Sequence, residues 1–107
     1  MSNLAKRAFS GWISTALLVL STAVPAGAFD VEAGRRMAEV WCSGCHIVDG
    51  DGTSDVAPGF RQIANDPSKT PDRLRTWLAN PHPPMPNFNL SRPEIDDIIA
   101  YLESLRD

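Results

Sequence analysis

Hydrophobic residues recur at helical spacing in several stretches of the chain, and the polar, glycine-rich and proline-rich stretches between them lack this period. The C-terminal stretch shows the pattern most clearly, with apolar side chains at Ile95, Ile98, Ile99, Leu102 and Leu105. Ser91 and Glu94 have the spacing of a capping box just before it. We therefore predict a helix that begins after Ser91 and runs to about Arg106, with its charged residues facing water.

Three shorter helices are predicted before it. The first covers residues 30–41, with an aspartate at its cap position. Its apolar stripe consists of Gly34, Ala38, Trp41 and Cys45. A single helical turn is expected at residues 60–64, and a third helix at residues 70–79, with Pro71 in its first position and Pro81 beyond its end. The pattern thus predicts an all-α fold of about four short helices.

The loop at residues 81–88 stands out because four of its residues are prolines. Proline fixes φ and has no amide hydrogen, so we predict a stiff, extended loop here. Met85 lies inside it. A methionine without helical partners is poorly explained as core filling, whereas a thioether ligand held in place by prolines explains it well. Met37 is the rival sulfur donor, and His82 is the rival imidazole.

The first 28 residues have the features of a secretory signal peptide. Lys6 and Arg7 precede an apolar run from Trp12 to Val24, and Ala26-Gly27-Ala28 fits a cleavage site. The run is shorter than the ~20 residues that a membrane-spanning helix needs. We predict cleavage after Ala28 and export to the periplasm. An uncleaved N-terminal anchor is the alternative.

Cleavage would leave one small domain, from Phe29 to Asp107. Two of the 10 basic residues lie in the leader, which leaves 8 against 13 acidic residues, a net charge of −5, and Lys69 as the sole lysine. This balance argues against nucleic acid and against an acidic lipid surface as partners. A domain of this size usually needs a stabilising element beyond its own core, such as a disulfide or a bound cofactor.

Both cysteines belong to one motif, Cys42-Ser43-Gly44-Cys45-His46, which indicates covalent attachment of a c-type haem. On a helical turn the two cysteines and the histidine project from one face. The thiols can then add to the two vinyl groups of one porphyrin edge while the imidazole reaches the iron. A covalently held haem would also supply the apolar core that so small a domain lacks.

Three other interpretations of the motif have weaker support. A thioredoxin-like redox pair needs a preceding strand and a βαβ pattern, which the sequence does not display. A structural zinc site needs a fourth ligand, for which His82 is the only other strong donor. A plain disulfide would leave His46 without a role.

The haem motif near the start of the domain, Pro58 sixteen residues after Cys42, and Met85 towards the end together resemble a class I c-type cytochrome. The resemblance covers nearly all of the chain after residue 28 and implies a domain wrapped around one covalently bound haem c. It implies axial ligation of the iron by His46 and Met85. It also implies that the Pro58 carbonyl accepts a hydrogen bond from the proximal histidine, which would orient the imidazole.

Other positions fit the resemblance less completely. Gly34 matches the glycine at which the first and last helices of the family cross, but Ala38 stands where the family has an aromatic residue. Trp41 or the partner helix would have to fill that space. The resemblance makes Trp77 a candidate hydrogen-bond donor to a haem propionate, although a core position is its simpler interpretation.

A six-coordinate haem leaves no open position for a substrate. We therefore expect a periplasmic one-electron carrier of a respiratory chain, monomeric and not an enzyme, with one redox protein as donor and another as acceptor. The mature chain is not expected to insert stably into a membrane. The alternatives are a dedicated haem subunit of a dehydrogenase or oxidase complex, and a haem enzyme or gas sensor with an open iron site.

Replacing both Cys42 and Cys45 with serine should leave no haem attached after denaturation, since no thioether can form. The domain should also fail to fold, because its core would lack the haem. Haem staining of denaturing gels and limited proteolysis measure the two effects. A double variant that stays protease-resistant would show that the domain does not need haem in order to fold.

Overall fold

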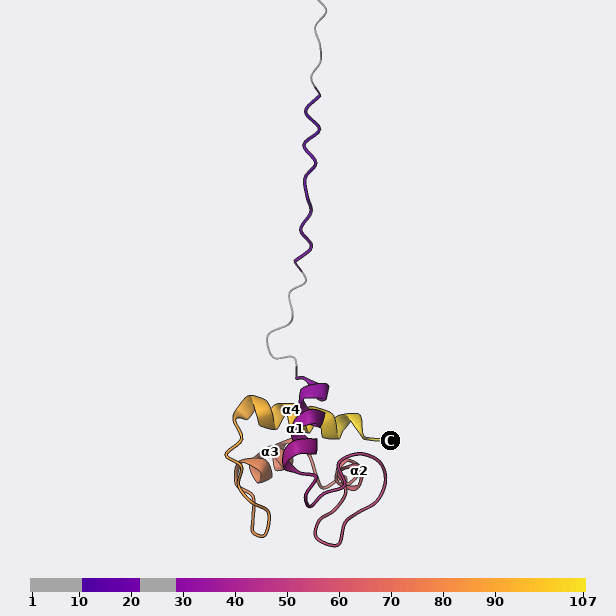
Figure 1. Ribbon diagram of the computed structural model, residues 1–107, viewed down its shortest axis with the longest axis vertical. Coiled ribbons are helices and arrows are strands. Elements are labelled where there is room, and N and C mark those ends of the chain that lie inside the picture. The colour runs from indigo at the N-terminus through magenta and orange to yellow at the C-terminus, as the bar shows by residue number, and fades with distance from the viewer. Residues whose placement is uncertain (1–10, 22–28) are drawn as a thin grey trace, which may run out of the picture.

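The computed structural model describes residues 11–21 and 29–107, and all of its regular elements are helices. In chain order they are α1 (Val31–Trp41), α2 (Phe60–Ala64), α3 (Pro71–Ala79) and α4 (Arg92–Ser104) (Figure 1). The all-α prediction is therefore confirmed. The predicted leader residues Lys6 and Arg7 and its cleavage site lie outside the described residues. None of the helices in the described ranges has the length and hydrophobicity needed to cross a membrane.

The helix boundaries follow the capping residues that the sequence contains. The Asp30 side chain accepts a hydrogen bond from the Ala33 amide at 2.9 Å. The Ser91 amide donates to the Glu94 carboxylate at 2.7 Å, which completes the predicted capping box. α4 ends at Ser104, two residues before the predicted end at Arg106. Its last turn tightens into 3₁₀-type hydrogen bonds between residues three apart, such as Leu105 N to Leu102 O at 3.0 Å.

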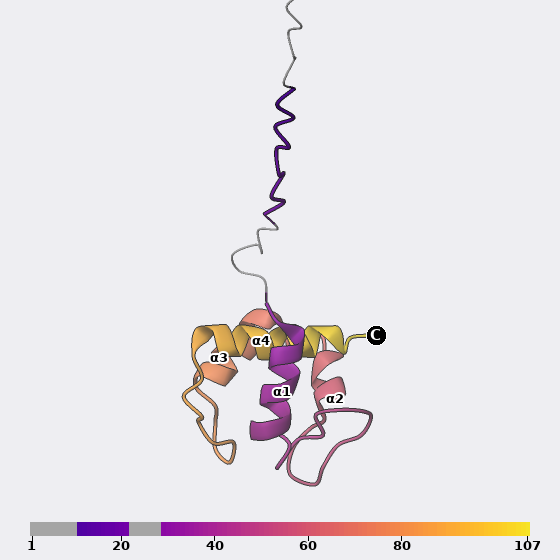
Figure 2. The same cartoon turned by 45° about the horizontal axis from the view of Figure 1, so that its top comes forward.

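α1 and α4 cross at Gly34, as the resemblance implied, and their backbones touch there (Figure 2). A Cβ added to Gly34 would lie only 1.9 Å from the carbonyl oxygen of Asp97 on α4. The Asp97 carboxylate in turn accepts a hydrogen bond from the Asp30 amide at 2.9 Å, beside the start of α1. Glycine is therefore required at this position by the close approach of the two helices.

The hydrophobic core lies mainly on the inner face of α4. Its buried members are Ala38, Val48, Phe60, Leu74, Ile95, Ile98, Ile99, Tyr101 and Leu102. Ala38 is fully buried, and aromatic rings enter the core from Phe60 and Tyr101, whose centroids are 6.1 Å apart. Trp41 does not fill the space beside Ala38: its side chain is 55% exposed and contacts Phe88 instead. The predicted stripe of α1 is thus buried at Gly34 and Ala38, whereas Trp41 is exposed and Cys45 lies beyond the end of the helix.

α3 is fastened to α4 by an ion pair that the sequence pattern did not reveal. The Arg75 guanidinium donates to the Asp96 carboxylate from Nε at 3.1 Å and from Nη2 at 3.0 Å. Asp96 and Asp97 were both expected on a water-facing surface, but each has a partner on another element. In Figure 2, the end of α1 lies between the loop at 47–59 and the loop at 80–91.

Gly34→Ala should destabilise the haem-loaded protein by about 2–3 kcal/mol, because the new methyl group would force the α1 and α4 backbones apart. Denaturant unfolding followed by tryptophan fluorescence gives the free energy of unfolding. Val40→Ala, at a 72% exposed position of the same helix, is the control and should change stability by less than about 0.5 kcal/mol. Equal stability of the two variants would contradict this account of the crossing.

Candidate haem-binding site

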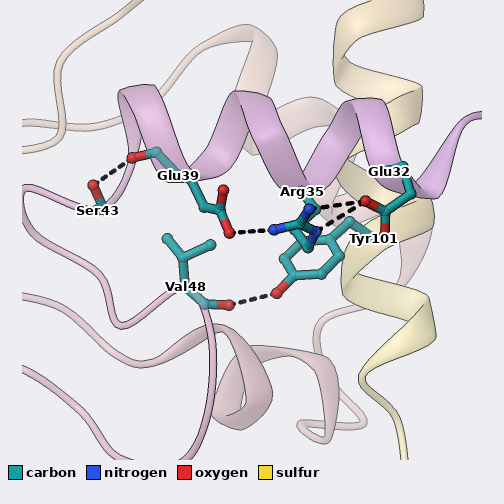
Figure 3. A network of polar contacts seen from close by, with 6 residues as sticks. All are labelled: Glu32, Arg35, Glu39, Ser43, Val48 and Tyr101. Carbon is teal, nitrogen blue, oxygen red and sulfur yellow. Dashed lines mark hydrogen bonds and ion pairs between the residues drawn. The ribbon is translucent and has the colours of Figure 1, made fainter.

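The cysteine–histidine motif forms a turn directly after α1. The amide of Cys45 donates to the Cys42 carbonyl at 3.1 Å, and the amide of His46 donates to the same carbonyl at 2.9 Å. The Ser43 hydroxyl donates to the Glu39 carbonyl at 2.5 Å, which joins the turn to the last turn of α1 (Figure 3). Both thiols are free rather than disulfide-bonded. The structure thus retains the helical spacing of the motif beyond the helix itself.

The His46 imidazole is oriented by the loop that follows it. Its Nδ1 atom lies 2.7 Å from the Pro58 carbonyl oxygen, and its ring stands edge-on to Phe60 with centroids 5.5 Å apart. A carbonyl can only accept, so Nδ1 carries the proton and donates it. Nε2 is then the unprotonated nitrogen, with a lone pair available to a metal ion.

The loop at 47–59 is held in place by contacts that sequence reasoning missed. The buried Tyr101 hydroxyl on α4 donates to the Val48 carbonyl at 2.7 Å (Figure 3). The Ser54 hydroxyl donates to the Cys45 carbonyl, so the loop is also hydrogen-bonded to the cysteine–histidine motif. The helical period could place Tyr101 in the core but could not identify the partner of its hydroxyl. Burial also raises the pKa of Tyr101, which keeps the hydroxyl a donor.

Three charged residues of α1 form a chain of ion pairs beside Tyr101. Arg35 pairs with Glu32 at 2.9 Å and with Glu39 at 2.5 Å (Figure 3). These pairs have helical spacing and are partly exposed, so each adds only a few tenths of a kcal/mol to stability. They keep this surface of α1 polar and give no sign of a binding site.

Met85 lies in a turn of the proline-rich loop. Its amide donates to the His82 carbonyl at 3.0 Å, and its side chain is half-buried. The indole Nε1–H of Trp77 donates to the Met85 sulfur at 3.2 Å. Trp77, which the sequence makes a candidate propionate donor or core residue, is 44% exposed, and its N–H points to the sulfur.

The two rival donors, Met37 and His82, lie in different surroundings. Met37 packs against the hydrophobic core on α1, so its sulfur fills space there. His82 is exposed, and its ring stands edge-on to Trp77 with centroids 4.9 Å apart. Among the described residues, no group of three or more histidine, cysteine or acidic residues is arranged to hold a metal ion. Burial raises the pKa of the Cys42 thiol to about 11.

A cavity of about 530 Å³ lies beside α3, with Ile63, Leu74, Trp77 and His82 among its lining residues. Neither the cysteines nor His46 border it. The candidate haem site is therefore defined by its donor atoms and is separate from this cavity.

Residues 29–102 match the family model described as cytochrome C oxidase, cbb3-type, subunit III. The chain therefore belongs to this family of c-type cytochromes, in agreement with its helical fold and its cysteine–histidine motif. Cytochrome c-552 of Bradyrhizobium diazoefficiens is 40% identical over 96 residues, which cover 88% of this chain and 92% of that relative. No solved structure matches the chain.

Membership of this family implies a covalently bound haem c and a role in electron transfer rather than in catalysis. The residues present fit such a group. Two free thiols lie three residues apart beside an imidazole whose Nε2 is available, and a neutral thioether is held in a separate loop. As a c-type cytochrome, the protein exchanges electrons with redox partners.

Proposed function

We propose that this protein is an exported one-electron carrier whose haem c is bound through Cys42 and Cys45 and ligated by His46 and Met85. The haem iron supplies the one-electron redox couple. The protein's part is to hold both axial donors in fixed places, so that little rearrangement accompanies a change of oxidation state. With His46 and Met85 both bound to the iron, no open position would be left for a substrate.

The hydrogen bond from His46 Nδ1 to the Pro58 carbonyl is the observation that carries the proposal. It selects the tautomer in which Nε2 is unprotonated and fixes the plane of the ring. It also makes the imidazole a stronger electron-pair donor to a metal ion. A histidine that served only packing would have no need of this orientation beside two free thiols. The bond therefore supports proximal ligation by His46.

Met85 is proposed as the second axial ligand because its sulfur is held by a neighbouring helix in a loop with little freedom. A neutral thioether favours ferrous iron over ferric iron, so the reduction potential should be relatively high. Electron transfer between partners then requires only that the haem edge approach the surface, near the exposed Cys45.

Export follows from the features of residues 1–28, which we propose are removed after Ala28. The mature carrier would be residues 29–107, monomeric and located in the periplasm. Haem attachment outside the cytoplasm would be consistent with this route.

A dedicated subunit of an oxidase is the second candidate, because the matching family is named after one. The exposed aromatic pair Trp41 and Phe88 offers apolar surface for a permanent partner. We favour the free carrier because the chain covers 92% of a relative named simply as a cytochrome c-552. Gel filtration of the periplasmic extract separates the two: a haem-stained species at the mass of the mature chain supports the carrier, and a stable larger complex supports the subunit.

Met85→Ala should abolish the ferric sulfur-to-iron charge-transfer band and lower the reduction potential, because water or His82 would replace the thioether. The domain should stay folded, since the half-buried side chain costs less to remove than a core residue. Absorption spectroscopy and redox titration measure these effects.

Met37→Ala is the matched control for this experiment. It removes a sulfur that packs on the core, so it should lower stability by about 1–3 kcal/mol while leaving the band and the potential in place. If Met85→Ala retained the band and His82→Ala lost it, the assignment of the second axial ligand would be wrong.

The acidic balance of the mature domain should appear in its kinetics with small redox reagents. Anionic ferricyanide should oxidise the reduced protein faster as salt is added, because salt screens the repulsion from a net charge of −5. A cationic cobalt(III) complex should react more slowly as salt is added. The opposite pair of trends, measured by stopped flow, would indicate a basic docking face and a different class of partner.

A further inference from the structure

The Ser54 hydroxyl joins two parts of the chain that both bear on the His46 ring. It donates to the Cys45 carbonyl, which belongs to the peptide bond directly before His46. The same oxygen accepts a hydrogen bond from the amide of Ala57 at 3.1 Å. Ser54 is half-buried and lies nine residues from Cys45 in the chain. One side chain therefore connects the cysteine–histidine motif with the segment that leads to Pro58.

The hydroxyl of Ser54 has one hydrogen, so it can donate to only one acceptor. The Ala57 carbonyl lies 3.2 Å from it, but this carbonyl already accepts from the Thr53 hydroxyl at 2.9 Å and from the Ser54 amide at 3.2 Å. The Cys45 carbonyl is the closer acceptor. The hydroxyl hydrogen therefore belongs to the bond with Cys45.

The ends of the loop around Ser54 are held together by two contacts. The amide of Phe60 donates to the Ile47 carbonyl at 2.8 Å. Gly52 packs against Gly59 so closely that a Cβ added to Gly59 would lie 1.9 Å from the Gly52 carbonyl oxygen. Since these contacts fix the base of the loop, the position of the turn within it depends on the hydrogen bonds that the turn itself makes.

We propose that Ser54 is a positioning residue for the proximal histidine. Its hydroxyl holds the turn at 54–57 against the Cys45–His46 peptide, and so keeps the Pro58 carbonyl where Nδ1 of the imidazole can donate to it. Without the hydroxyl, the turn loses its bond to the motif. The imidazole is then oriented less firmly and donates less to the iron. This inference rests on the proposed ligation of the iron by His46.

Ser54→Ala tests the proposal because it removes the hydroxyl with little change in volume. In the reduced, haem-loaded protein, the Nδ1–H of His46 should exchange with solvent about fivefold faster, the effect of losing one hydrogen bond. The equilibrium constant for reduction by a common mediator should rise about two- to threefold, because a weaker imidazole donor stabilises ferric iron less. NMR and redox titration measure the two effects.

Two further variants separate the bond to the motif from the turn itself. Ser54→Thr keeps the hydroxyl and should have the exchange rate and potential of the wild type. Thr53→Val is the matched control: it removes a hydroxyl from the same turn, but one that bonds only to carbonyls within the loop. It should change neither value. The proposal would be overturned if Ser54→Ala matched the wild type, if Ser54→Thr behaved like Ser54→Ala, or if Thr53→Val shifted both values equally.

A second measurement uses the wild-type protein alone. The Ala57 amide donates to the Ser54 side chain, so its hydrogen exchange should be at least about tenfold slower than that of a free peptide. Exchange at the free-peptide rate would contradict the turn that Ser54 forms. A different failure would concern the ligand itself. If the His46 ring protons of the reduced protein lacked the large upfield shift caused by a bound haem, ligation by His46 would be refuted, whatever the Ser54 variants showed.

Discussion

The contact of two backbones at Gly34 is the constraint on which the rest of this domain depends. It allows α1 and α4 to approach so closely that a Cβ would overlap the Asp97 carbonyl. α4 supplies most of the buried core, and α1 ends at the cysteine–histidine motif. The crossing therefore sets where the motif lies relative to every other element, although Gly34 has no part in the chemistry.

The proposed axial ligands are supported in parallel ways by separate parts of the chain. The loop after the motif presents the Pro58 carbonyl to His46, and α3 presents an indole N–H to Met85. Each support is one hydrogen bond, and each comes from an element that is itself fastened to α4, through Tyr101 and through Asp96. α4 thus anchors the supports of both proposed ligands.

The small size of the domain explains why a covalent cofactor suits it. The core is small, and Ile98 is the largest side chain that is fully buried in the described part of the chain. Trp41, Trp77 and Phe88 remain substantially exposed near the motif and the methionine loop. A covalently bound haem would add a large apolar surface to such a core, so the cofactor contributes to stability as well as to redox chemistry.

The sequence by itself determined the four helices, their caps and the chemistry of the cysteine–histidine motif, because these depend on local spacing and on local side-chain hydrogen bonds. The helical period could not show that Trp41 faces outwards or that Asp96 pairs with Arg75. Nor could it show that the Tyr101 hydroxyl is hydrogen-bonded to the loop at 47–59. Those outcomes depend on residues far apart in the chain, so only the packing of the helices and the loops between them decided them. The bond from Trp77 to Met85 spans just eight residues, yet it too required the end of α3 and the following turn to be placed in space.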